Sequence, residues 1–384
     1  MTRDQKRRAA IIAAAGAAGL AGLAVAGLLF AWSGLYSVAA SRGHWAIFEW
    51  FLAFAMRNSV RTHALLVQVP PLENPHLARL GAGHFHSGCA FCHGAPGIPV
   101  NPVAEQMLPP PPTLSEAAGD WATRELFWIV KHGIKYTGMP AWAAQEREDE
   151  VWAVVAFLRR LPQLTPQQYR ELALDRVEVH DRSGPELATA ESDPQAAGAC
   201  ARCHGAGATG PASHLVPVLH GQKVEYLIQA LQAYAKGSRR SGIMQPLASP
   251  LDDDSIARLA RYYAGLARPP PRFPPDREHA HPASVASGRR LAAAGDPDAR
   301  IPACNACHGE AGLATFPRLD GQHAPYLARQ LQLWKEGVNT GTGAGTIMAP
   351  IAGRLTDKQV RDVSAYYASL APAPVLTPAG KVAP

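Results

Sequence analysis

The strongest constraint on the fold of this chain is a five-residue pattern, Cys-x-x-Cys-His, that occurs three times, at residues 89–93, 200–204 and 304–308. The first cysteines are separated by 111 residues (89 to 200) and then by 104 (200 to 304). Spacings this similar indicate repeated units of one architecture. All six cysteines of the chain belong to these pairs, so none is left for a structural disulfide. The motif residues are Cys89, Cys92, His93, Cys200, Cys203, His204, Cys304, Cys307 and His308.

Covalent attachment of haem explains this spacing. Two thiols add to the two vinyl groups of haem, and the adjacent histidine then reaches the iron from the same side. A zinc site would need four ligands from neighbouring pairs, but these pairs lie more than 100 residues apart. A thioredoxin-like dithiol is expected near a βαβ pattern, which is absent here. The sequence therefore predicts three covalently bound haem c groups.

Three methionines occupy corresponding places after the motifs. Met139, Met244 and Met348 follow the motif histidines by 46 residues (93 to 139), 40 (204 to 244) and 40 (308 to 348), each with proline close behind. Methionine is a common second axial ligand that raises the haem potential, whereas a single methionine is more often core filler. We therefore predict the axial pairs His93 and Met139, His204 and Met244, and His308 and Met348. Met107, only 14 residues after His93, is interpreted as packing.

Helical periodicity frames each repeat and predicts an all-α fold. Apolar residues spaced three or four apart predict a closing helix after each methionine, at 148–161, 252–266 and 356–370. A first helix is expected before each motif, at 76–87, 187–199 and 284–294, although Pro194 shortens or breaks the second. Gly81, Gly83 and Gly288 would allow close helix contact.

The second and third repeats also share Gly-Gln, Tyr-Leu and Leu-Gln pairs at a constant offset of 100 residues, for example 221–222 and 321–322. On the Cys-x-x-Cys-His motifs and the methionines that follow them, all three repeats resemble class I cytochrome c domains, although the first lacks the Gly-Gln pair. Residues 184–372 resemble the di-haem cytochrome c4 family. The resemblance implies that the closing helices carry Tyr-Tyr pairs and that the paired haem edges dock together. It also implies that each motif histidine donates to a proline carbonyl, with Pro211 and Pro317 as candidates and Pro96 or Pro99 in the first domain.

The N-terminus predicts a membrane anchor. Lys6, Arg7 and Arg8 precede an uncharged stretch, and its apolar core at 11–32 has 22 residues, enough to span a bilayer as a helix. A cleaved signal peptide is the alternative, with small residues at 37–39. The aromatic segment 44–64 predicts a helix that lies either at the membrane surface or on the first domain.

These features divide the chain into eight segments. We expect a basic tail and transmembrane anchor (1–33), a juxtamembrane amphipathic segment (34–70), three cytochrome c domains (71–163, 184–268 and 284–372), a polar linker (164–183), a Pro-rich linker (269–283) and a tail (373–384). Below, the first, second and third domains mean these three ranges. His84 and His86, beside the first motif, are expected to be exposed.

Charge and motifs limit the function classes. Of the net charge of +6, residues 1–8 supply +3, and no basic block is interleaved with aromatics, so nucleic-acid binding is not expected. The leading hypothesis is an electron carrier, not an enzyme, anchored in the bacterial inner membrane with its haem domains in the periplasm. It would link a quinol-oxidising complex to a terminal oxidase or reductase. The alternative is a cytochrome subunit of a periplasmic alcohol or aldehyde dehydrogenase. A di-haem peroxidase would need an open iron site, which three methionines disfavour.

Overall fold

The computed structural model describes residues 2–174, 197–270, 281–309 and 312–371, and these are helical with no β-strand. Two isolated β-bridges close short loops, one between Ala95 and Ile98 and the other between Asp296 and Ile301. The all-α prediction is therefore confirmed. The helices are α1 (Arg3–Trp32), α2 (Ala46–Ala64), α3 (Pro75–Gly88), α4 (Ala90–His93), α5 (Pro102–Glu105), α6 (Leu114–Ala117), η1 (Ala118–Asp120), α7 (Thr123–His132), α8 (Glu148–Leu158), η2 (Leu161–Gln163), α9 (Pro166–Ala173), α11 (Ala197–His204), α12 (Val224–Ala235), α13 (Met244–Ala248), α14 (Asp253–Gly265), α15 (Pro282–Ala294), α16 (Asn305–His308), α17 (Ala324–Lys335), α18 (Gly343–Ala352) and α19 (Asp357–Ser369).

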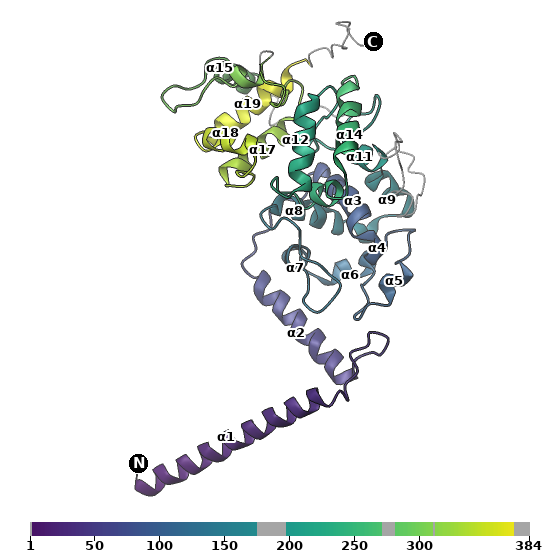
Figure 1. The fold of residues 1–384 in the computed structure, drawn as a ribbon, viewed down its shortest axis with the longest axis vertical. Helices are drawn as coiled ribbons and strands as arrows, with labels where there is room; N and C mark the ends of the chain where they lie inside the picture. The colour runs from purple at the N-terminus through teal and green to yellow at the C-terminus, as the bar shows by residue number, and fades with distance from the viewer. Residues whose placement is uncertain (1, 175–196, 271–280, 310–311, 372–384) are drawn as a thin grey trace.

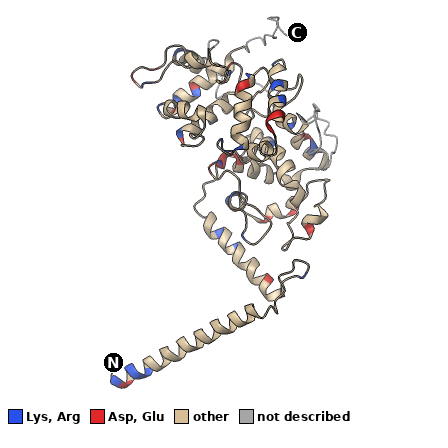
Figure 2. Cartoon of the chain, in the orientation of Figure 1, with Lys and Arg blue, Asp and Glu red and all other residues tan. Residues whose placement is uncertain are grey.

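Helix α1 extends away from the rest of the molecule (Figure 1). It is 30 residues long, none of them is buried, and it is the one described helix long and apolar enough to cross a membrane. Its basic residues gather at the start, and the remainder of the helix carries no charge (Figure 2). Length and composition alone suit either an anchor or a signal sequence.

Helix α2 connects α1 to the first domain and has two different halves. At its C-terminal end, Val60 and Ala64 are buried, and His63 stacks on Trp128 of α7 with ring centroids 5.7 Å apart. Its N-terminal half keeps large apolar side chains exposed to solvent: Ile47, Phe48, Trp50, Phe51, Leu52 and Phe54. Each of the two predicted placements therefore fits one half of the helix.

The first domain is built around the crossing of α3 and α8. A Cβ on Gly81 would lie 2.0 Å from the carbonyl oxygen of Ala153, so only glycine lets the two helices approach this closely. Phe85 and Phe157 meet in the core, with ring centroids 5.0 Å apart. Helix α9 lies in the range expected as linker, yet its Tyr169 is buried in the same core.

The third domain repeats this arrangement. Helices α15 and α19 cross at Gly288, where a Cβ would lie 2.0 Å from the carbonyl oxygen of Asp362. In the second domain α12 packs on α14, as α17 packs on α19. The predicted helix 187–199 lies largely outside the described residues, and α11 there carries the Cys-x-x-Cys-His motif itself. Most of the Pro-rich linker and the whole of the predicted tail, 373–384, also lie outside them.

A reciprocal pair of glutamines joins the second and third domains. Gln222 donates to the carbonyl of Arg318 (3.0 Å) and accepts from its N–H (2.8 Å). Gln322 donates to the carbonyl of Val218 (3.1 Å) and accepts from its N–H (2.9 Å). Since both glutamines are buried, this is an ordered contact between domains rather than a loose encounter.

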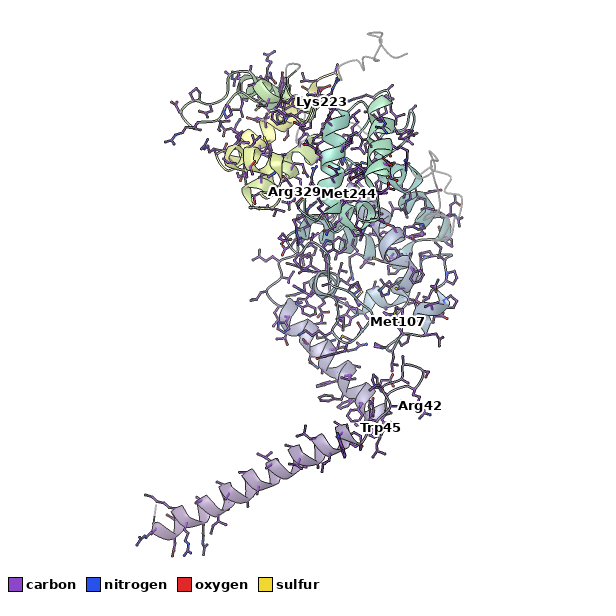
Figure 3. The ribbon with its side chains drawn as sticks, in the orientation of Figure 1. Arg42, Trp45, Met107, Lys223, Met244 and Arg329 are labelled. Atoms are coloured by element: carbon purple, nitrogen blue, oxygen red, sulfur yellow. The ribbon has the colours of Figure 1, made fainter. Side chains whose placement is uncertain are left out.

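The first domain docks on the other two. The Arg329 guanidinium of the third domain lies 3.0 Å from the carboxylate of Asp149 in the first. The backbone N–H of Arg240 in the second domain donates to Asn339 of the third, at 2.5 Å. The three domains therefore meet at one junction, near the labelled Met244 and Arg329 (Figure 3).

Candidate haem sites

Each motif histidine ends a short helix that glycine terminates: α4, α11 and α16. Gly94 and Gly205 have φ of +63° and +75°, a backbone conformation that side chains rarely adopt. Gly309 has negative φ, but a Cβ there would lie 2.5 Å from the carbonyl oxygen of Asn305. Glycine is thus required at all three places, for two different steric reasons.

All three histidines are oriented by a proline carbonyl. Nδ1 of His93, His204 and His308 lies 2.9, 3.1 and 3.0 Å from the carbonyl oxygens of Pro112, Pro217 and Pro317. This bond fixes the ring and leaves Nε2 available for a metal. The choice of Pro317 is confirmed.

The choices of Pro211, and of Pro96 or Pro99, were wrong. The carbonyls used come 13 residues after His204 and 19 after His93. Nearness in sequence is a poor guide here because the intervening loops differ in length and double back to the histidine ring.

Burial sets the protonation of the motif residues. It lowers the pKa of His93, His204 and His308, which favours the neutral imidazole that can bind a metal. It also raises the pKa of Cys89 to about 12 and that of Cys200 to about 11. Redox-active dithiols show the opposite shift, since a reactive thiolate needs a depressed pKa. These sites therefore suit thioether attachment better than dithiol chemistry.

The second and third sites open into one continuous cavity. Its lining includes the residues predicted as ligands in each domain, His204 and Met244 in one and His308 and Met348 in the other. It is mostly apolar, which suits a planar hydrophobic macrocycle. Motif cysteines also line it: Cys200, Cys203 and Cys304. The residues present therefore fit haem at both sites.

At the first site, His93 is buried and Met139 is half-buried. The Met139 loop is held by its own backbone, since the Met139 carbonyl accepts from the N–H of Ile134 at 3.2 Å. Met107 packs against this loop: a Cβ on Gly138 would lie 2.6 Å from its sulfur atom. This contact agrees with a packing role for Met107. The pairing of His93 with Met139 stays a prediction.

The closing helices are tied to the motifs by tyrosines. The Tyr263 hydroxyl donates to the carbonyl of Gly205 at 3.0 Å, and the Tyr367 hydroxyl donates to Oδ1 of Asn305 at 2.8 Å. The backbone carbonyls of the same tyrosines accept from Gly221 and Gly321. Motif, Gly-Gln turn and closing helix are therefore connected in the same way in both domains.

The expectation that His84 and His86 are exposed was wrong. His84 is mostly buried and meets Trp142 edge-on, with ring centroids 4.8 Å apart. Burial lowers the pKa of His84 to about 4, with the charge of Arg202 as a second cause. His86 is half-buried and hydrogen-bonded to the Tyr169 hydroxyl at 3.0 Å. Their cover comes from segments distant in the sequence, the one that carries Trp142 and the one that carries Tyr169.

Sequence reasoning missed several residues at the shared cavity. Arg239 is enclosed there, with its guanidinium 3.4 Å from the Tyr226 hydroxyl and 3.3 Å from the Tyr326 hydroxyl. Its pKa is raised because those tyrosines and Tyr234 outweigh the effect of burial. Tyr226 and Tyr326 belong to the repeated Tyr-Leu pairs of the sequence, but Tyr234 and Arg239 lie outside that pattern, so nothing in the sequence pointed to them.

Models of known protein families match each of the three domains that carry a Cys-x-x-Cys-His motif. The model for cytochrome c oxidase, cbb3-type, subunit III, matches residues 76–158 and 187–262, and the model for cytochrome c matches 285–371. A thiosulfate dehydrogenase electron acceptor from Thiomonas intermedia is 36% identical over 182 residues, which cover 46% of this chain and 80% of that protein. The chain belongs to the cytochrome c family.

Other relatives of this cytochrome include cytochromes c4. Cytochrome c4 from Thiocapsa roseopersicina is 34% identical over 204 residues, or 50% of this chain and 97% of that protein. The solved cytochrome c4 of Acidithiobacillus ferrooxidans is 33% identical with a TM-score of 0.40, and the match covers 44% of this chain and 98% of that one. The family models and these curated relatives show that electron transfer through covalently bound haem c is the general function of the chain.

Proposed function

We propose that this cytochrome is a tri-haem electron relay in the periplasmic part of a respiratory chain. The observation that carries the proposal is the single cavity lined by the motif residues of the second and third domains. The first domain adjoins the same unit, since a Cβ on its Gly83 would lie 3.2 Å from Sγ of Cys203. The three motifs are thus brought into one assembly.

In this proposal the six cysteines hold three haems, and His93, His204 and His308 pair with Met139, Met244 and Met348 as axial ligands. Haem supplies the one-electron chemistry, while the chain supplies ligands, burial and spacing. A methionine at every site closes the iron to substrates, which supports a carrier without catalytic activity of its own. The peroxidase alternative has no supporting observation.

The donor would be a quinol-oxidising complex and the acceptor a terminal oxidase or reductase. The match to a family described as an oxidase subunit supports the oxidase. A second candidate is the cytochrome subunit of a periplasmic dehydrogenase. It is favoured by the relative named as an electron acceptor of thiosulfate dehydrogenase. That name points to an inorganic sulfur substrate rather than the alcohol or aldehyde first considered.

We further propose that α1 stays attached as an inner-membrane anchor and that the exposed half of α2 lies in the membrane interface. Aromatic side chains favour that depth, and Trp45 and Trp50 are both more than half exposed. This places the first domain nearest the membrane and the shared cavity further out.

A spectroscopic count of haem tests the relay. The pyridine haemochrome assay on the purified full-length chain should give three haems c, and the oxidised protein should show the near-infrared Met–Fe(III) band. A count of two, or a high-spin haem, would contradict the proposal. Copurification then separates the candidates: an oxidase or quinol-oxidising complex supports the relay, and a large dehydrogenase subunit supports the second candidate.

A further inference from the structure

Glu150 belongs to the first domain, but its carboxylate is bonded to the second. It is buried, with 3% of its surface exposed. One carboxylate oxygen accepts from the Ser241 hydroxyl and the other from the N–H of Gly242, each at 2.6 Å. Arg147 lies 2.9 Å from the same carboxylate and also donates to the carbonyl of Arg240. A buried ion pair therefore engages three consecutive residues, 240–242, of the neighbouring domain.

Those residues lead directly to Met244. The Ser241 hydroxyl oxygen accepts from the N–H of Met244 at 2.9 Å and from that of Ile243 at 3.3 Å. A chain of hydrogen bonds thus runs from the Glu150 carboxylate through Ser241 to the backbone of Met244. A hydroxyl that donates to a carboxylate is polarised and becomes a stronger acceptor, so the two links reinforce each other.

Packing holds the same loop from a second direction. The Trp142 indole lies against Gly242, where a Cβ would be 2.1 Å from its Nε1. Ile243 is buried within the core of the first domain rather than that of its own. The segment before Met244 is therefore built into the first domain by both side-chain packing and charge-assisted hydrogen bonds.

We propose that the first domain, through Glu150, holds the ligand loop of the second haem site, so that Met244 stays bound to the iron only while the first domain is docked. The inference rests on the proposed function, in which Met244 is the axial ligand. Glu150 is then a positioning residue that acts through Ser241. The potential of the second haem is coupled to the docking of the first domain, because methionine ligation raises that potential.

The substitution Glu150→Gln tests this role with little change in shape. A carboxylate can accept from both donors, whereas an amide must turn its NH₂ group toward one of them. Ser241→Ala is a second variant that keeps Glu150 bonded to Gly242 and paired with Arg147 but removes the link to Met244. Arg329→Gln is the matched control, since it breaks the Asp149 contact at the same junction without touching residues 240–244.

The readouts are the Met–Fe(III) band, the potentials from a redox titration, and carbon monoxide binding by the reduced full-length protein. In both test variants we expect the band to fall by about one third, one potential to drop, and about one haem in three to bind carbon monoxide. Arg329→Gln should match the wild type.

An unchanged band and no carbon monoxide binding in both variants would overturn the inference. The same loss in Arg329→Gln would also overturn it, since general loosening of the junction would then explain the effect. Failure of the proposed function is distinct from either result, because the wild type itself would then lack the band or bind carbon monoxide.

Discussion

The imidazole rings of His76 and His214 are stacked with their centroids 4.4 Å apart, although one belongs to the first domain and the other to the second. His323 of the third domain lies next in the row, 5.0 Å from the ring of His214. Burial lowers the pKa of His323 to about 4, and the charges of His214 and His76 lower it further, against a carbonyl of Val216 that raises it. One histidine from each domain therefore meets at the junction.

This row predicts acid sensitivity. Below its ordinary pKa of 6.5, unfolded His323 binds a proton that the folded chain excludes. The contribution of neutral His323 to the free energy of unfolding should therefore be fully present above about pH 6.5. It should be lost as the pH falls toward 4, by up to about 3 kcal/mol. Denaturant unfolding across this range measures the decline.

His84 and His220 have similarly lowered pKa values and contribute to the same decline. The comparison is therefore with His323→Gln, which cannot ionise at this position and should lose less stability on acidification. An equal decline in that variant and the wild type would contradict the assignment.

The paired glutamines predict a costly substitution between domains. Gln322→Ala would leave the buried N–H and carbonyl of Val218 without partners, at about 1–3 kcal/mol for each group. We expect the second and third domains to separate more readily, seen as faster hydrogen exchange at the Val218 amide. Gln232→Ala is the control, because among the residues that the structure describes its side chain bonds to Asp253, which lies within the second domain. Unchanged exchange at Val218 would contradict the role of the paired glutamines in holding the two domains together.

The helix crossings predict which glycines cannot be replaced. Gly81→Ala places a methyl group 2.0 Å from a backbone oxygen of α8, and separating the helices should cost about 1–3 kcal/mol or more. Gly198→Ala in α11 meets nothing within 4 Å and should be neutral or stabilising by about 0.5–1 kcal/mol. Thermal unfolding measures both effects. The unfolding temperature of Gly81→Ala should fall, whereas that of Gly198→Ala should stay the same or rise.

The exposed half of α2 predicts contact with lipid. In nanodiscs, brominated acyl chains should quench part of the tryptophan fluorescence of the full-length chain, because Trp45 and Trp50 would lie at the interface. The double variant Trp45→Phe, Trp50→Phe should show a smaller quenched fraction, because Trp32 at the end of the proposed anchor α1 would then be the tryptophan left near the bilayer. An equal or larger quenched fraction in the double variant would place this half of α2 away from the bilayer.

The sequence predicted the elements that depend on local patterns. The helices α3, α8, α14, α15 and α19 each agree with an expected range to within a few residues, since periodicity and capping residues define them. Gly81 and Gly288 also lie where helices cross, as expected.

Contacts between segments distant in the sequence could not be predicted. His84 and His86 looked exposed because helical periodicity does not show that Trp142 and Tyr169, more than 50 residues further along the chain, pack against them. Glu150 looked like an ordinary charged residue at the start of a helix, and only the placement of residues 240–242 reveals its role. The predictions of the proline partners of His93 and His204 were wrong for a similar reason, because the path of a loop does not follow from the number of residues in it.

The glutamine contact has one further consequence. Because Gln222 and Gln322 each bond to the segment before the other, the second and third domains present equivalent, self-complementary patches, like the isologous interface of a symmetric dimer. Joining both patches in one chain closes that interface internally and leaves neither available to a neighbouring molecule. A chain truncated before the third domain would uncover one patch and should pair with a second copy of itself.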